Sequence, residues 1–103
     1  MTGAALTEAV YYILLSLLQP MHGYGIMQTV QELSRGRVRL AAGTLYGALN
    51  TLQEKGWIRA LPGEAESRKK EYEITEAGRG ALQAELDRLC ELAENGRKLL
   101  GGK

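Results

Sequence analysis

The apolar residues in the first half of the chain recur every three or four positions, the spacing of one face of a helix. Thr7 is a good N-cap for the first such segment, and Pro20 marks the point before which it should stop. A second segment should end near Gly36, and a third should run from about Ala42–Thr44 to Lys55-Gly56. We therefore expect three helices. Their apolar positions are, in order, Val10, Ile13, Leu14, Leu17 and Leu18, then Ile26, Met27, Val30 and Leu33, then Leu45, Ala48, Leu49 and Leu52.

Two stretches in the second half alternate between apolar and polar residues, the pattern of half-buried β-strands. Trp57–Leu61 and Glu71–Ile74 flank a polar loop that starts at Pro62-Gly63, so we expect them to pair as an antiparallel hairpin. Val38–Leu40 also alternates, and it predicts a short strand between the second and third helices. Thr75 is placed to cap a last helix.

The last helix carries a narrow apolar seam instead of a broad core-facing stripe. Its positions are four, three and four residues apart: Leu82, Leu86, Leu89 and Ala93. Such a heptad-like spacing is typical of a helix that packs against one other helix. A chain of 103 residues has a modest core, so burial against another copy would add to its stability. We expect this seam to hold a homodimer together.

The order of the expected elements indicates the fold. Three helices followed by a two-stranded hairpin are the order of a winged helix-turn-helix, here with one helix added. The fold class we expect is mainly α with a small β-hairpin. We divide the chain into a winged helix-turn-helix over residues 1–75, a dimerisation helix over residues 76–100 and a tail over residues 101–103.

Charge is distributed unevenly, although the chain as a whole carries only +1. Residues 35–72 hold eight Lys and Arg against four Glu, so the positive excess lies entirely in this middle third. A local basic surface is what binding to phosphates requires, because the field that faces the DNA is the one that matters. The low net charge equally suits a winged-helix module that binds another protein and not DNA.

Several classes of function lack the residues they need. His22 is the only histidine and Cys90 the only cysteine, so we expect no metal site, no cofactor and no catalytic triad, and hence no enzyme. A single cysteine forms no disulfide within the chain and suits the reducing cytoplasm. The apolar run Val10–Leu18 is too short to span a membrane. Glu8 precedes it in place of the basic segment of a secretory signal, so we expect no such signal.

The third helix has the composition of a recognition helix. Gly43 and Gly47 let a backbone approach base edges, Thr44 can contact a phosphate or a thymine methyl, and Asn50 can read adenine. The two glycines could equally serve close packing against the second helix. After the hairpin loop, Arg68, Lys69 and Lys70 stand where a wing would reach phosphates, although a solvated charge run is the plainer interpretation.

Four blocks of the sequence resemble the PadR family of transcriptional regulators, in its short subfamily with a single C-terminal helix. The resemblance runs from about Leu14 to Leu82, with the blocks in the family's order and spacing. The blocks are His22–Ile26, Ala42–Tyr46 leading to Leu49, Leu52 and Glu54–Gly56, then Arg68–Tyr72, and Ile74–Gly78.

The resemblance implies a repressor that binds a pseudo-palindromic operator in duplex DNA as a dimer. Tyr24, Thr44, Tyr46, Lys69 and Lys70 match positions that contact DNA in the family. The first helix, through Ile13 and Leu17, would share the dimer interface with the seam. Many members respond to phenolic or drug-like compounds, which implies a small-molecule effector.

The sequence departs from the family's pattern at two places that matter for function. Ala41 stands where many relatives carry a hydroxyl-bearing cap, and its loss costs about 1 kcal/mol of helix stability. The last helix has no aromatic residue on which a flat compound could stack.

Overall fold

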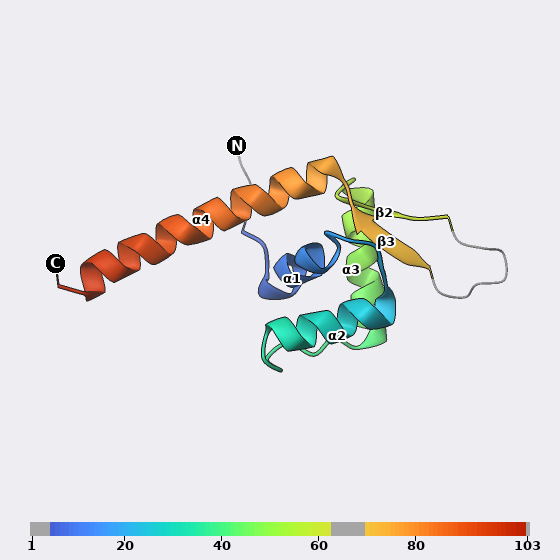
Figure 1. Cartoon of the computed structure of the whole chain (residues 1–103), viewed down its shortest axis with the longest axis horizontal. Helices are drawn as coiled ribbons and strands as arrows, with labels where there is room; N and C mark the ends of the chain where they lie inside the picture. The colour runs from blue at the N-terminus through green and yellow to red at the C-terminus, as the bar shows by residue number, and fades with distance from the viewer. Residues whose placement is uncertain (1–4, 63–69, 103) are drawn as a thin grey trace.

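A computed structural model describes residues 5–62 and 70–102 of the chain (Figure 1). It confirms the mainly α fold with a small antiparallel sheet, and its helices fall where the apolar periodicity predicts them. The elements in chain order are α1 (Glu8–Ser16), β1 (Met21–His22), α2 (Gly23–Leu33), α3 (Ala42–Glu54), β2 (Ile58–Ala60), β3 (Glu71–Ile74) and α4 (Glu76–Leu100).

The helix ends are set by side-chain caps and by left-handed backbone. Thr7 and Thr75 both act as the N-caps predicted for them, each accepting a backbone N–H through its hydroxyl oxygen. At the end of α2, Arg35 and Gly36 both have positive φ, and the N–H of Gly36 donates to the carbonyl of Gln31 at 2.8 Å. These contacts form a Schellman motif. The first left-handed residue after the helix is Arg35, one position before Gly36.

One core unites the helices and the sheet. The buried side chains come from α1, α2, α3, the hairpin and the first turns of α4. The start of α4 therefore packs into the same hydrophobic core as the three other helices. Its members are Ile13, Leu14, Leu17, Ile26, Val30, Leu45, Leu49, Leu52, Ile58, Tyr72, Ile74 and Leu82.

The sheet has three strands in the order β1-β3-β2, all antiparallel. Across the hairpin, Ile58 pairs with Ile74 and Arg59 with Glu73, which confirms the predicted pairing. The third strand lies elsewhere than predicted. It is Met21–His22, whereas Val38–Leu40 is an irregular turn. The reason is local: the N–H of Val38 donates to the hydroxyl of Ser34 at 2.9 Å and is not available to a ladder.

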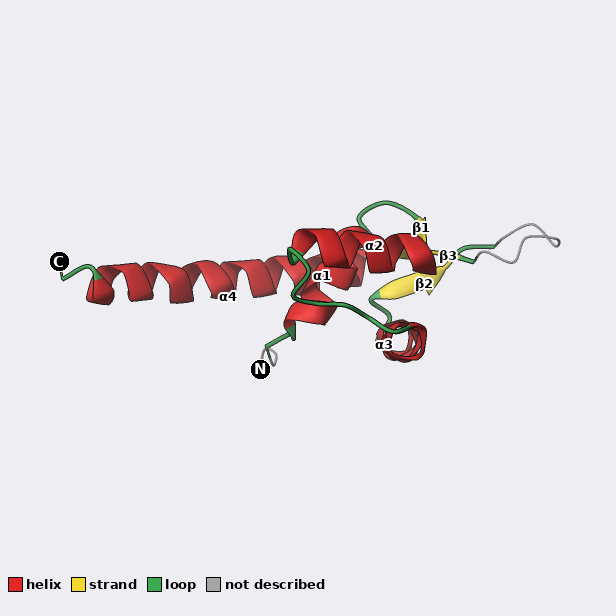
Figure 2. Ribbon diagram, turned by 90° about the horizontal axis from the view of Figure 1, so that it is seen from below, coloured by secondary structure: helices red, strands yellow, loops and turns green. Residues whose placement is uncertain are grey.

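The molecule is elongated, 60 × 31 × 20 Å, because α4 continues past the compact body (Figure 1). Seen from below, the distal turns of α4 extend to one side alone, while the sheet and α3 lie at the other end (Figure 2). A helix of 25 residues is about 37 Å long. We call the compact part that contains α1, α2, α3 and the sheet the body, and the part of α4 that projects from it the arm.

Candidate nucleic-acid interface

From Gly43 to Asn50 the outward face of α3 consists of small and uncharged side chains, and the exposed Glu54 follows them on the same face. Gly43, Thr44, Gly47 and Asn50 are all exposed, and a Cβ added at either glycine would meet nothing within 4 Å. The two glycines therefore do not serve packing against any described part of the chain. With no bulky side chain in the way, the backbone of α3 can approach another surface closely.

The N-terminus of α2 lies beside the first turn of α3. Gly23 is buried there because the ring and hydroxyl of Tyr46 occupy the space that a side chain at position 23 would need. Tyr46 is still 45% exposed and Tyr24 is 64% exposed, so both side chains reach the surface at this corner. Gln28, a residue that the sequence analysis did not single out, donates from its amide to the Tyr24 hydroxyl at 3.4 Å.

His22 has a structural part in this arrangement. Its Nδ1 accepts the backbone N–H of Gly25 at 3.2 Å and so caps α2, while its backbone pairs with Glu71 in the sheet. The cap orients the start of α2, where Tyr24 stands. The sequence contains too little alternation around Met21 to reveal this strand.

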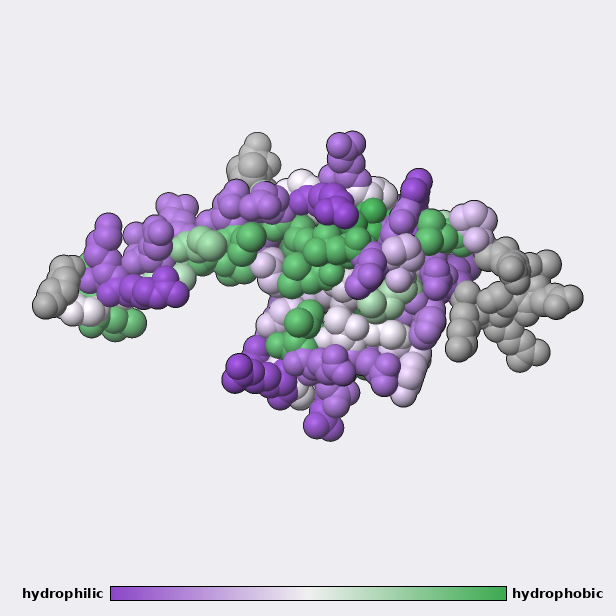
Figure 3. Space-filling view, in the orientation of Figure 1, coloured by the Kyte–Doolittle hydropathy of each residue, from purple (hydrophilic) through white to green (hydrophobic). Residues whose placement is uncertain are grey.

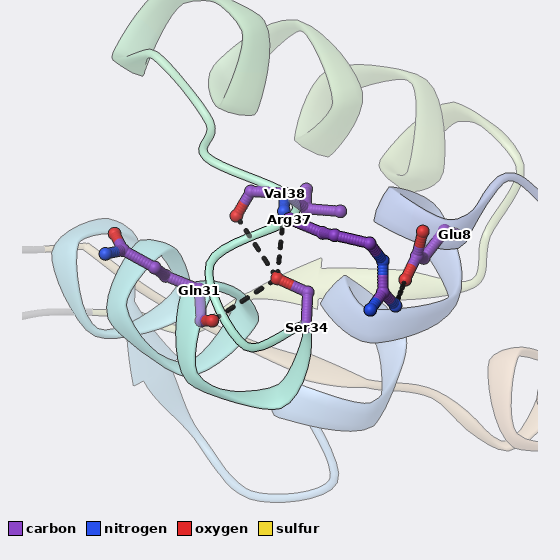
Figure 4. Close-up of polar contacts among 5 residues, drawn as sticks. All are labelled: Glu8, Gln31, Ser34, Arg37 and Val38. Atoms are coloured by element: carbon purple, nitrogen blue, oxygen red, sulfur yellow. Dashed lines mark hydrogen bonds and ion pairs between the residues drawn. The ribbon is translucent and has the colours of Figure 1, made fainter.

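The turn between α2 and α3 is held by short polar contacts (Figure 4). The buried hydroxyl of Ser34 donates to the carbonyl of Gln31 at 3.2 Å, in addition to accepting from Val38. Arg37 forms an ion pair with Glu8 of α1. The turn is thus fastened to α1, which fixes where α3 begins.

Two of the eight basic residues of the middle third are neutralised within the fold. Besides Arg37, Arg59 pairs with Glu73 directly across the hairpin, as their register requires. Lys70, at the base of the wing, is exposed, as are Arg35 and Arg39 of the α2–α3 turn. Within the described residues, these three cations have no carboxylate at ion-pair distance. The predicted wing residues Arg68 and Lys69 lie outside the described residues.

The start of α4 is joined tightly to the end of α3. The Thr75 hydroxyl donates to the carbonyl of Gly56 at 2.6 Å, and the Thr75 N–H donates to the carbonyl of Trp57 at 2.9 Å. Gly78 is buried against the same peptide, where a Cβ would overlap the Trp57 carbonyl. The direction of α4 is therefore fixed relative to the exposed face of α3.

The expected dimer residues have very different exposures. Leu86 is 41% exposed and Leu89 36% exposed, and Ala93 is exposed as well. Leu82, at 7% exposure, mainly packs inside its own chain. The expectation for Ile13 and Leu17 is wrong, because both are fully buried in the core and have no surface to offer a partner. Beside α4, the residues that reach the surface are instead Tyr11 and Leu15 of α1 and Leu18 of the turn after it.

Several of the exposed leucines gather in one band. Figure 3 shows hydrophobic side chains over the centre of the body and along the lower edge of α4. A groove of about 260 Å³ lies between α1 and α4 there, lined among others by Leu15, Leu18 and Leu86. Further along α4, Leu92 and Leu99 are 53% and 81% exposed. We call this band the leucine seam and define it by Leu18, Leu86, Leu89, Leu92 and Ala93.

A buried carboxylate ties the N-terminal segment to α4. Glu85 is 5% exposed and accepts the backbone N–H of Leu6 at 3.2 Å, while Arg88 donates to both of its oxygens. These hydrogen bonds, first of all those from Arg88, hold the pKa of Glu85 below its usual value. Sequence reasoning missed this residue, because a glutamate between seam positions looks like a solvated charge.

The described residues contain no cluster of three or more His, Cys, Asp or Glu side chains that could hold a metal ion. None of the helices, as far as the chain is described, is long and apolar enough to cross a membrane. Cys90 is an exposed free thiol on α4.

Comparisons with known proteins agree with the geometry. A family model described as the transcriptional regulator PadR-like family matches residues 13–84. The chain is similar to a transcriptional regulator of Mycobacterium tuberculosis, with 40% identity over 77 residues that cover 71% of this chain and 66% of that protein. It is also 36% identical over 74 residues to an uncharacterised 37.1 kDa protein of a transposon from Streptomyces fradiae. That match covers 72% of this chain and 20% of the transposon protein.

The fold has counterparts among solved structures. A PadR family transcriptional regulator from Eggerthella lenta superposes with a TM-score of 0.72 over 91% of this chain and 82% of that chain. Its sequence identity of 23% supports the shared fold alone.

Proposed function

Because this chain belongs to the PadR-like family of transcriptional regulators, we propose that it binds duplex DNA as a homodimer and represses transcription from a pseudo-palindromic operator. The family is one of regulators and not of enzymes. In this proposal residues 1–75 form the DNA-binding part and residues 76–100 join the two copies. The protein acts in the cytoplasm. The observation that carries the proposal is the part of the exposed face of α3 formed by Gly43, Thr44, Gly47 and Asn50, which is small, uncharged and, among the described residues, unobstructed at both glycines.

The proposed contacts divide into two kinds. Thr44 and Asn50 reach base edges from α3, and Gly43 and Gly47 allow the helix to enter the major groove. Tyr24, Tyr46 and the exposed cations bind phosphates, which fix the position of the protein on the duplex without reading sequence. The wing cations in this proposal are Arg68, Lys69 and Lys70.

The dependence of affinity on salt tests this proposal. For duplexes from the region upstream of the protein's own gene, log affinity should fall linearly with log salt, by about 0.9 per neutralised phosphate. Replacing Lys69 and Lys70 with alanine should weaken binding to every duplex and flatten that slope. Asn50→Ala should instead change the preference among sequences and leave the slope unchanged. Glu91→Ala, on α4, is the matched control.

The competing function is a winged-helix module that binds a protein partner. The ion pairs that neutralise Arg37 and Arg59 favour it, because they lower the positive charge available to phosphates. An affinity for duplex DNA that is weak and insensitive to salt would support this alternative and contradict ours.

A small-molecule effector that relieves repression is part of the same proposal. Because α4 has no aromatic residue, stacking of a flat compound along that helix has no basis in this chain. An effector would have to bind against other surfaces.

A further inference from the structure

A larger pocket lies on the body, apart from the leucine seam. It measures about 460 Å³ and lies between the N-terminal segment, the start of α1 and the C-terminal half of α3. Leu6 and Val10 form one wall, Ala48 and Leu52 the opposite wall, and Trp57 lines it as well. The volume is within the range of pockets that bind small molecules, which are lined mostly by apolar side chains. We call it the α1–α3 pocket.

Its polar groups are few, and all but one are already engaged. The hydroxyl of Thr7 accepts the N–H of Val10 at 3.1 Å, and the hydroxyl of Thr51 donates to the carbonyl of Gly47 at 3.2 Å. The remaining polar side chain is Lys55, the one charged residue of the lining. Its Nζ stands 5.1 Å from the centroid of the Trp57 ring, and no described carboxylate pairs with it.

We propose that the α1–α3 pocket binds a small organic anion with an apolar body. The body would displace water from the walls of Leu52 and Trp57, and the anionic group would pair with the Lys55 ammonium at the rim. The charge of the rim decides between classes of ligand. A single cation with no described carboxylate at ion-pair distance favours an anion and disfavours a cation, while a neutral compound would gain from the walls alone.

The place of the pocket distinguishes it from the surfaces described above. It shares no lining residue with the groove between α1 and α4. Ala48, Leu52 and Lys55 lie on the side of α3 turned away from Gly43 and Asn50, as helical spacing requires. A ligand here would contact α3 without covering Gly43 or Asn50, although Thr51, on the side of Thr44, also lines the pocket. Any effect of that ligand on DNA affinity rests on the proposed function, whereas the binding itself does not.

Trp57 makes the binding measurable, because it is the one tryptophan of the chain. The probe is 1-anilinonaphthalene-8-sulfonate, an aromatic anion that accepts energy from tryptophan, and N-phenyl-1-naphthylamine is its neutral counterpart. We expect saturable quenching of Trp57 with one anionic probe bound per chain. Lys55→Met should weaken the anionic probe by about two- to fivefold, the range of an exposed ion pair, and leave the neutral probe unaffected. Lys55→Arg should restore the anionic probe.

A pocket-filling variant tests the location. Ala48→Leu adds a side chain where the pocket is, and it should weaken both probes by about tenfold or more. Ala84→Leu, an exposed position on the opposite side of α4 from the seam, is the matched control and should change neither. Thermal melting followed by circular dichroism establishes that both variants fold.

Other occupants give different results, and each would overturn the proposal. Leu86→Ser would abolish probe binding if the probe sits on the leucine seam. Deletion of residues 1–4 would create binding that the full chain lacks if this segment fills the pocket. Trp57 emission that shifts with protein concentration, without probe, would mean that a second copy covers it. Because no DNA is present, failure here leaves the proposed DNA binding untouched.

Discussion

The two halves of α4 have opposite surroundings although they belong to one continuous helix. In the first half, Gly78 and Leu82 are buried against the body and Glu85 is hydrogen-bonded to Leu6. In the second half, Leu92 is 53% exposed and Leu100 is 91% exposed. Contacts within the chain explain the burial of Gly78, Leu82 and Glu85 in the first half, whereas Leu86 remains 41% exposed. The leucines of the second half are not covered by the described chain, and exposed apolar rows of this kind are typical of interaction surfaces, which is the basis of the proposed dimer.

The same comparison separates the leucine seam from the exposed face of α3. Both surfaces are open, but one is apolar and the other is small and polar. Each suits a different partner: another apolar helix on α4, and a polar, charged macromolecule on α3. The joint at Thr75 and Gly78 connects the two surfaces, so the distance between two DNA-facing helices in a dimer would be set by this joint.

The largest expected difference is in the free energy of unfolding, between replacing a leucine of the body and replacing a leucine of the arm. Leu49 is fully buried, so Leu49→Ala should lower the free energy of unfolding by about 2–5 kcal/mol through lost contacts and a cavity. Leu99, at 81% exposure, is the matched residue on the arm, and Leu99→Ala should cost no more than about 0.5 kcal/mol. Urea unfolding at low protein concentration measures both. Equal losses would mean that the arm is packed in the free chain.

Disrupting the leucine seam should affect association and not folding. Leu86→Ser combined with Leu89→Ser should weaken the dimer on the order of 100-fold or more, because a dimer contains four of these leucines, each 36–41% exposed in the single chain, and complete burial of one leucine contributes about 1.5–3 kcal/mol. Sedimentation equilibrium reports the change directly. Asp87→Ser combined with Glu91→Ser, off the seam on the same helix, is the control and should leave the dimer intact. A dimer that survives the first pair of changes would locate the interface elsewhere.

A smaller gain is expected at the start of α3, which begins without a side-chain cap at Ala41. Ala41→Ser supplies the missing acceptor and should raise the free energy of unfolding by about 1 kcal/mol. Ala41→Val changes the side chain without providing a cap and should give no gain. If both variants have the stability of the parent chain in urea unfolding, the start of α3 does not limit the stability of the body.

The smallest effect concerns pH and the contact of Glu85. Its pKa is lowered in the folded state by hydrogen bonds from Arg88 and Leu6, so it stabilises the fold above the carboxyl's ordinary pKa. That stabilisation is lost as the pH falls through the lowered pKa. Glu85→Gln should therefore be less stable than the parent near neutral pH, with a gap that closes on acidification. Glu91→Gln is the control, and a constant gap at all pH values would contradict the role given to the charge.

Most of the fold follows from periodicity and caps. The four helices and the hairpin were predictable because their apolar residues repeat at helical or alternating spacing, and because Thr7 and Thr75 stand at helix starts. The strand β1 was not predictable, since two residues carry no period and its partner β3 is far along the sequence. Val38–Leu40 alternates by chance, and the hydroxyl of Ser34 takes the hydrogen bond that a strand would need.

The candidate site was predictable in its composition and less so in its surroundings. The small residues of α3 and the exposed tyrosines stand where expected. The burial of Ile13 and Leu17 could not be read from the sequence, because an apolar helix does not indicate which of its sides faces its own chain. The pairing of Arg37 with Glu8 joins residues far apart in sequence, so the local charge excess overstated the free cations.

The most direct test of the central claim is genomic footprinting with the purified protein and, in parallel, with the Leu86→Ser and Leu89→Ser double variant. We predict protected sites made of two inverted half-sites, with centres separated by about one helical turn of DNA or a multiple of it. The double variant should protect the same half-sites far more weakly. Protection of single, unpaired sites with equal strength by both proteins, or no protection by either, would contradict the account.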